Sequence, residues 1–299
     1  MRTLWRTFVE TTKLVTTHRK LWVPFLVMAI AELGVLAVGW LAPHPPFSRL
    51  LAPPVRYFFG ERVLHYPWHL WFLFHVMKHT YFAAATLIGA FMSGLACEMI
   101  RQIHQGQPVS LHVAWTSKRV RYSTMVCLWL ISWAVGRGFV ELLVQLAPHG
   151  KGTAWAAVGV VWFLQGLLAY AIPAAVFEGS RWVKALAQGI REFLHHPVST
   201  LIIVAGPSLA VLFFALVVSD NQVSLWMDQI APEIALAFVA LRLIVWTVAD
   251  AVLTVSVAHL WWLHRASAPA IATIGGTAAA GPPANSTRRK PLRGVSVVA

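Results

Sequence analysis

The stretch EGSRWVKALAQGIREFLHHP, residues Glu178–Pro197, is the one long polar interruption in the middle of an otherwise apolar chain. Read as a helix that starts after Ser180, it places large apolar side chains on one face and most of its charged residues on the other. A helix of this kind lies in the plane of the membrane surface, with its apolar side toward the acyl chains and its cations toward lipid phosphates. The expected lipid contacts are Arg181, Trp182, Lys184 and Arg191.

Two other stretches have a similar arrangement. The N-terminal residues form one such pattern, with Trp5 and Arg6 as expected lipid contacts, and the weaker PVSLHVAWTSKRV carries Trp115. Each stretch precedes an apolar run. The chain therefore reads as three hairpin repeats, each with an interfacial helix, a crossing outward and a crossing back. An alternative stays open, because any even-numbered bundle with amphipathic inner loops would show the same pattern.

The composition indicates an integral membrane protein. Of 299 residues, 58% are hydrophobic and 12% are charged, and the mean hydropathy is +0.65. A soluble domain would carry about 25% charged residues. Since lipid offers no partner for backbone amides, the expected fold is all-α, a polytopic bundle of six transmembrane helices. These expected crossings are Leu21–Ala42, Leu70–Cys97, Ser123–Leu146, Thr153–Phe177, Val198–Val218 and Ile234–Leu263.

The distribution of Lys and Arg predicts the orientation of the bundle. With the N-terminus inside, the inner segments hold seventeen Lys and Arg residues and the outer loops hold four. The positive-inside rule then places both termini in the cytoplasm and the protein in the cell inner membrane. We expect residues 1–265 to form the transmembrane domain and residues 266–299 a disordered basic cytoplasmic tail that contacts anionic lipid.

The net charge of +13 is explained by this topology. In a soluble chain it would favour nucleic-acid binding, but here the cations lie mainly in short loops beside apolar runs. We expect no nucleic-acid partner. The expected partners are membrane lipids, through their anionic headgroups, with a membrane-protein partner as a further possibility.

Six ionisable residues lie inside the expected crossings, where an unpaired charge is costly. Two interpretations stay open. The charges form helix-locking ion pairs, such as Arg137 with Glu141 and Glu32 with Arg242, or they line a polar cavity of net positive character that receives an anionic group. At 1.5 Å per residue, Glu32 lies near the midplane and Asp250 near the inner face. The candidate polar site consists of Glu32, Lys78, Arg137, Glu141, Arg242 and Asp250.

Histidines at helical spacing raise the question of a metal. The pairs four residues apart are His65 with His69 and His75 with His79. Zinc sites need at least one further protein ligand, and no Cys, Asp or HExxH motif lies nearby, so we expect interfacial histidines, no metal and no other cofactor. Walker, dinucleotide and nucleophile-elbow motifs are absent as well. We therefore expect no catalytic residues, and a membrane enzyme ranks third, behind the two functional hypotheses below.

The phrase IPAAVFEGSRWVKALAQGIREFLHHP, after the fourth expected crossing, resembles a loose group of six-helix bacterial inner-membrane proteins. The group includes the membrane domain fused to some glycerophosphodiester phosphodiesterases. The resemblance rests on a proline, an acid, a small residue and then an amphipathic helix. It implies a multi-pass membrane role and supplies no catalytic residues.

Two functional hypotheses follow from these patterns. The first is a multi-pass protein of structural, regulatory or assembly type that acts through lipid or protein contacts. The alternative is a transporter or permease for an anionic or lipid-like solute that uses the intramembrane charges. A transporter needs an accessible route to those charges, whereas a structural protein buries them in mutual pairs.

Overall fold

The computed structural model describes residues 2–65, 68, 79–146, 151–219 and 232–267. Within these ranges the side chains of residues 2–8, 144, 146, 151–154, 157, 210–219, 232–236 and 238–239 are not described. Every regular element in this part of the chain is a helix, which confirms the all-α prediction there. The predicted tail 266–299 lies almost wholly outside the described residues, so its disorder stays a prediction.

Five helical segments are long and apolar enough to cross a membrane, and they make the chain a multi-pass membrane protein by helix length and hydropathy. They are Arg19–Leu41, His79–His104, Tyr122–Leu143, Val158–Glu178 and Ala240–Arg265. In order, the elements that form them are η1 (Arg19–Trp22) and α2 (Val23–Leu41), η3 (Ala85–Gly89) and α5 (Ala90–His104), α7 (Tyr122–Leu146), α8 (Lys151–Leu168) and α9 (Ala171–Glu178), and α13 (Pro232–Ser267).

Two of these helices end later than the sequence pattern indicates. The second extends to His104 rather than Cys97, because Glu98 and Arg101 pair with each other inside the helix. The start of that predicted crossing, through Lys78, lies outside the described residues. The last helix extends to Ser267 rather than Leu263, because polar side chains in its final turn bond to the neighbouring helices.

The fourth predicted crossing is divided. Helix α8 ends at Leu168, a turn covers Ala169 and Tyr170, and α9 begins at Ala171. Pro173 lies in the first turn of α9, where its missing N–H has no intrahelical partner to lose. Helix α9 ends at Gly179, whose φ of +64° is a left-handed conformation that favours glycine.

Helix α11 (Pro197–Ser219) follows as a further 23-residue helix rich in apolar residues. Its described apolar portion, Pro197–Leu209, is shorter than the five long segments.

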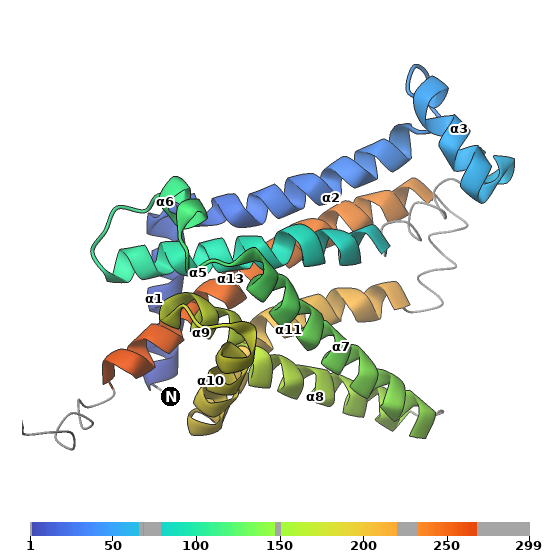
Figure 1. Cartoon of the computed structure of the whole chain (residues 1–299). Coiled ribbons are helices and arrows are strands. Elements are labelled where there is room, and N and C mark those ends of the chain that lie inside the picture. Colours follow the sequence, from blue (N-terminus) through green and yellow to red (C-terminus); the bar gives the residue numbers. More distant parts are fainter. Residues whose placement is uncertain (1, 66–67, 69–78, 147–150, 220–231, 268–299) are drawn as a thin grey trace, which may run out of the picture.

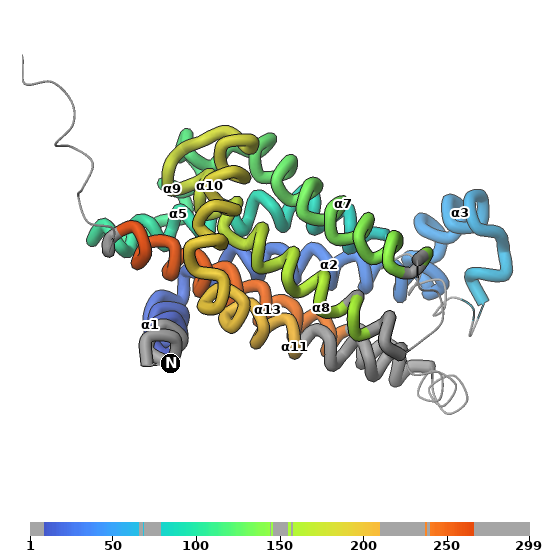
Figure 2. Tube along the Cα trace, turned by 90° about the horizontal axis from the view of Figure 1, so that it is seen from below, coloured from blue at the N-terminus to red at the C-terminus, as the bar shows by residue number. Residues whose placement is uncertain are grey.

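Short helices gather at the two ends of the long ones (Figures 1 and 2). At one end lie α1 (Arg2–Thr17), α6 (Leu111–Thr116) and α10 (Trp182–His195). At the other end lie α3 (Ser48–Phe59) and η2 (Glu61–Leu64). Helix α1 runs across the direction of the long helices in Figure 1 and is seen end-on in Figure 2. The first and last described residues therefore lie at the same end of the molecule.

The tightest packing lies toward the end that carries α1 and α10. There the fully buried side chains of four helices, α5, α9, α10 and α13, pack together with the turn that holds Tyr170. They include Leu95, Met99, Phe193 and Trp261. By contrast, 6% of the apolar window in Tyr122–Leu143 is buried, against 61% in His79–His104. Helix α7 therefore presents most of its apolar surface outward, as a lipid-facing helix does.

Candidate functional site: two adjoining cavities between the long helices

The first cavity has a volume of about 500 Å³ and is lined by residues of α5, α7, α8, α9 and α13. Its wall is mainly apolar, with Trp129, Trp133 and Leu164 among the lining side chains. The polar side chains on it are few: Ser93, Ser132, Arg137, Gln165 and Thr254. We name it the Arg137 cavity.

The second cavity, the Asp250 cavity, has a volume of about 580 Å³ and is lined mainly by residues of α8, α11 and α13. On its wall the Ser208 hydroxyl donates a hydrogen bond to Gln165 Oε1 at 2.9 Å. Trp246 Nε1 is buried and has no hydrogen-bond partner among the described residues. The side chain of Asp250 is exposed, and it lines this cavity. The cavity therefore combines an accessible carboxylate with an unused indole donor.

The two cavities adjoin. They share the lining residues Val140, Val161, Gln165 and Leu253, so a molecule in one would touch the wall of the other. Ligand pockets usually measure about 300–1,000 Å³ and combine apolar walls with a small number of polar groups. Both cavities have that size and that character.

Two of the predicted intramembrane charges form the expected pair. Arg137 Nε donates to Glu141 Oε1 at 2.6 Å, one turn apart on α7. Both side chains are more than half exposed, so this pair is not sealed inside the protein. The exposed guanidinium therefore has surface open to a further anionic group.

A second group of charges joins α2 to α13. Glu32, buried on α2, lies within electrostatic range of Arg242 and Asp250 on α13. The Arg242 guanidinium lies over the Trp246 ring, 4.2 Å from its centroid. Among the described contacts, no hydrogen bond or salt bridge joins Glu32 to Arg242. The expected interaction between these two residues is therefore a longer-range electrostatic attraction.

Asp250 lies midway along the 36 residues of α13, and its depth in the membrane stays a prediction. Among the described residues, Arg137 is the predicted cation that lines a cavity, and Asp250 gives the second cavity a carboxylate. The charged side chains that line these two cavities are thus one cation and one carboxylate. Lys78 lies outside the described residues.

The candidate histidines are only partly described. His65 is exposed and lies 3.9 Å from the Glu61 carboxylate, and His79 starts the described part of its helix. His69 and His75 lie outside the described residues. Among the described residues, the group whose ligand atoms converge is a different one, formed by Glu192, His196 and His264.

The expected lipid contacts on α10 are exposed, and part of the apolar face predicted to lie toward lipid is buried against the protein. Arg181, Trp182, Lys184 and Arg191 are exposed, as is Trp115 on α6. The face that packs on the protein consists of Ala185, Gly189 and Phe193. The reason is that Gly189 lets α10 approach the start of α9 so closely that a Cβ would lie 2.9 Å from a backbone nitrogen. The side chains of Trp5 and Arg6 are not among those described.

Beside the packed face, α10 exposes two further surfaces. Val183 and Leu194 form an apolar one, at 58% and 66% exposure. Lys184 and Arg191 form a cationic one. A helix that offers separate apolar and cationic surfaces, in addition to a protein contact, suits a position between acyl chains and headgroups.

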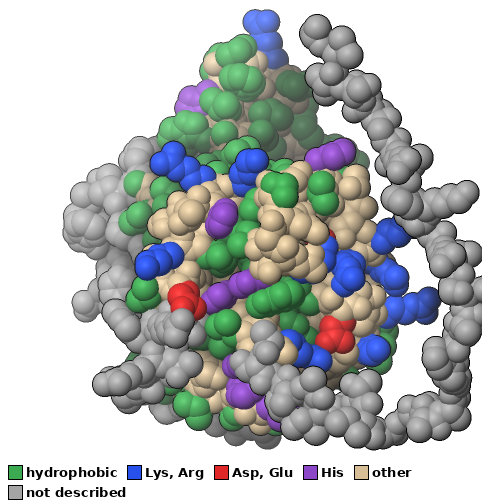
Figure 3. Space-filling model, turned by 90° about the vertical axis from the view of Figure 1, so that its left-hand side faces the viewer, with side chains coloured by type: hydrophobic (Ala, Val, Ile, Leu, Met, Phe, Trp, Pro, Cys, Tyr) green, Lys and Arg blue, Asp and Glu red, His purple; other side chains and the backbone are tan. Residues whose placement is uncertain are grey.

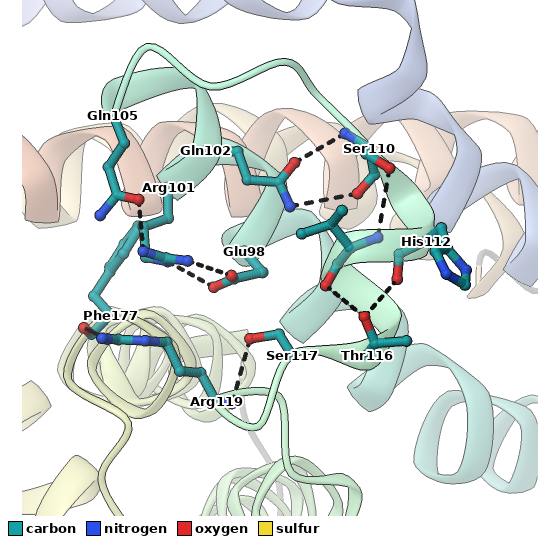
Figure 4. Close-up of polar contacts among 11 residues, drawn as sticks. Glu98, Arg101, Gln102, Gln105, Ser110, His112, Thr116, Ser117, Arg119 and Phe177 are labelled. Carbon is teal, nitrogen blue, oxygen red and sulfur yellow. Dashed lines mark hydrogen bonds and ion pairs between the residues drawn. The ribbon is translucent and has the colours of Figure 1, made fainter.

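A polar network closes the same end of the molecule (Figure 4). Glu98, almost fully buried, accepts from Arg101 Nε at 2.8 Å and from Arg101 Nη2 at 2.6 Å. Gln102 accepts a hydrogen bond from the backbone N–H of Ser110, and the Ser110 hydroxyl caps α6. Arg119 Nη1 donates to the carbonyl of Phe177 at the end of α9 at 2.6 Å. The loop between α5 and α7 is thus fixed to α5 and α9.

The sequence interpretation missed several of these polar groups. Gln165, Ser208 and Trp246 lie in apolar runs and carry no charge, so a search for charges passes over them. A glutamine in the middle of an expected crossing was the available signal, because an amide there needs a partner. Glu98 was missed because it follows Cys97, where the crossing was expected to end.

Comparisons with known protein families, with curated proteins and with solved structures found no match to this chain. The resemblance to six-helix inner-membrane proteins therefore stays a prediction that rests on the residues of one phrase.

Proposed function

We propose that this chain is a protein of the cell inner membrane with six crossings and both termini in the cytoplasm, and that it binds a lipid-like amphiphile in the two adjoining cavities. This is the lipid-binding form of the transporter hypothesis. It also keeps the lipid contacts of the first hypothesis, since the interfacial helices would hold anionic headgroups.

The end that carries α1, α6 and α10 is the proposed cytoplasmic end. Figure 3 looks onto this end, and Lys and Arg side chains are spread around it with His side chains between them. The exposed Lys184 and Arg191 belong to it. Helix α11, with 23 residues, would span about 34 Å at 1.5 Å per residue, which is enough for the sixth crossing.

The observation that carries the binding proposal is the shared wall of the two cavities, which is formed mainly by apolar residues. An acyl chain would contact Val140, Val161 and Leu253. Polar groups of the same molecule would reach the Arg137 guanidinium or the Gln165–Ser208 pair. The buried indole N–H of Trp246 at the Asp250 cavity also supports a polar ligand there, because a polar group buried without a partner costs free energy, and this one has no partner among the described residues.

Filling the cavity tests the proposal. Gly136 lines the Arg137 cavity, and a Cβ built there meets no heavy atom within 4 Å. Gly138 lies two residues further on the same helix, is equally free of contacts and does not line either cavity. Gly136→Leu should lower the amount of lipid that copurifies with the protein in mild detergent, measured by native mass spectrometry.

Gly138→Leu is the matched control, because it makes the same chemical change in the same helix. We expect it to retain lipid as the wild type does. Equal lipid in the two variants, or no lipid bound to the wild type, would refute the proposal.

A further inference from the structure

Three metal-ligating side chains converge where α10 meets the end of α13. The ligand atoms of Glu192, His196 and His264 all lie within 4.8 Å of one another. His264 Nδ1 lies 3.0 Å from Glu192 Oε1, and His196 Nε2 lies 4.0 Å from the same oxygen. The imidazole rings of His196 and His264 are tilted by 31° to each other, with their centroids 3.7 Å apart.

These distances suit a tetrahedral metal ion. With bonds of about 2.0–2.1 Å to nitrogen or oxygen, the ligand atoms around zinc are about 3.4 Å apart. The observed separations of 3.0 Å and 4.0 Å lie on either side of that value. Two imidazoles and one carboxylate form a three-ligand set that zinc accepts, with water in the fourth position.

Two elements that are far apart in the sequence, α10 with its C-cap and α13, supply the ligands. Glu192 lies in the last turn of α10, His196 follows α10 directly, and His264 lies in the last turn of α13. The backbone at His196 is held, because its carbonyl accepts from Thr200 Oγ1 at 2.8 Å and that hydroxyl is in turn 2.8 Å from Tyr170 Oη. Such outer contacts orient metal ligands and limit their movement.

The cluster is partly shielded from solvent. The side chains of Glu192 and His264 are 15% and 16% exposed, and that of His196 is the most open of the three at 44%. The neighbouring Arg265 is occupied by Glu178, at 2.6 Å.

We propose that Glu192, His196 and His264 form a Zn²⁺ site that fastens the interfacial helix α10 to the end of the last crossing. This proposal is separate from lipid binding in the cavities, since none of the three residues lines either of them. The ion would limit movement at the junction between α10 and α11.

The test measures Zn²⁺ bound to the purified full-length chain after treatment with a chelator, by equilibrium dialysis and elemental analysis. We expect His264→Gln and Glu192→Gln to lose one Zn²⁺ per chain relative to the wild type. The matched control is His195→Gln, because His195 is adjacent but its Nδ1 lies 2.7 Å from the carbonyl of Arg191, outside the cluster. We expect the control to bind Zn²⁺ as the wild type does.

X-ray absorption at the zinc edge of the wild-type chain needs no variant. We expect two imidazole ligands and two oxygen ligands. The proposal is overturned if the wild type binds no Zn²⁺, if the cluster variants bind as much as the wild type, if His195→Gln loses the same amount, or if the ligand shell contains sulfur or only oxygen.

Discussion

Replacing Arg101 by methionine leaves a buried carboxylate without its partner. Arg101 gives Glu98 two charge-assisted hydrogen bonds, at 2.8 Å and 2.6 Å, and donates a third bond to Gln105 at 2.7 Å. The side chain of Glu98 is 1% exposed, whereas that of Arg101 is 15% exposed. Water cannot replace the lost partner of Glu98.

The magnitude follows from this difference in exposure. Removing one partner of a buried pair costs about 3–5 kcal/mol, because the other charge stays uncompensated. We expect Arg101→Met to fall in that range. Glu98→Gln should cost less, about 1–3 kcal/mol, because the longer and more exposed Arg101 can turn toward water. The double variant removes both charges and should be more stable than Arg101→Met alone.

The assay measures the free energy of unfolding as the concentration of a denaturing detergent is raised. The fluorescence of the protein's 15 tryptophans reports the unfolding. Arg119→Met is the control, because Arg119 donates its hydrogen bond to the backbone carbonyl of Phe177. Its removal therefore leaves no carboxylate without a partner. We expect that change to cost about 1 kcal/mol. If Arg101→Met costs no more than Arg119→Met, or if the double variant is no better than Arg101→Met, the reasoning is wrong.

Three further outcomes are expected. Gly189→Ala places a Cβ 2.9 Å from a backbone nitrogen of α9 and should destabilise the chain by about 1–3 kcal/mol in the same assay, whereas Gly138→Ala meets no atom and should not. Lys184→Glu reverses an exposed cation of α10 and should lower the ratio of anionic to zwitterionic lipid that copurifies, by mass spectrometry; an unchanged ratio would count against α10 as a headgroup contact. The hydrogen bond from His264 lowers the pKa of Glu192 below its usual 4.5, so ionised Glu192 stabilises the fold above pH 4.5 and this contribution is lost as the pH falls through the lowered pKa. The stability difference between wild type and Glu192→Gln should therefore shrink below pH 4.5, and a constant difference would contradict it.

The apolar runs and the helix α10 could be predicted from the sequence, because each depends on local pattern. A run of about 20 apolar residues has to be a helix in lipid, whatever it packs against. Likewise, the alternation of cationic and apolar residues in Trp182–His195 is a property of that segment alone.

The cavities and the buried face of α10 could not be predicted in the same way. The Asp250 cavity depends on how α8, α11 and α13 pack, and the sequence gives no distance between Gln165 and Ser208. The packed face of α10 is set by the close approach at Gly189, where a small residue outweighs the larger apolar side chains. The three-hairpin repeat stays a prediction.

The most direct test of the account is the side of the membrane on which each end of the bundle lies. In a chain whose two cysteines, Cys97 and Cys127, are replaced by alanine, single cysteines are introduced at the exposed Tyr57 of α3 and Lys184 of α10. We predict that a membrane-impermeant thiol reagent labels Tyr57→Cys in spheroplasts and labels Lys184→Cys only in inside-out vesicles. The reverse pattern, or labelling of both positions from one side, would contradict the proposed orientation and the cytoplasmic placement of the interfacial helices.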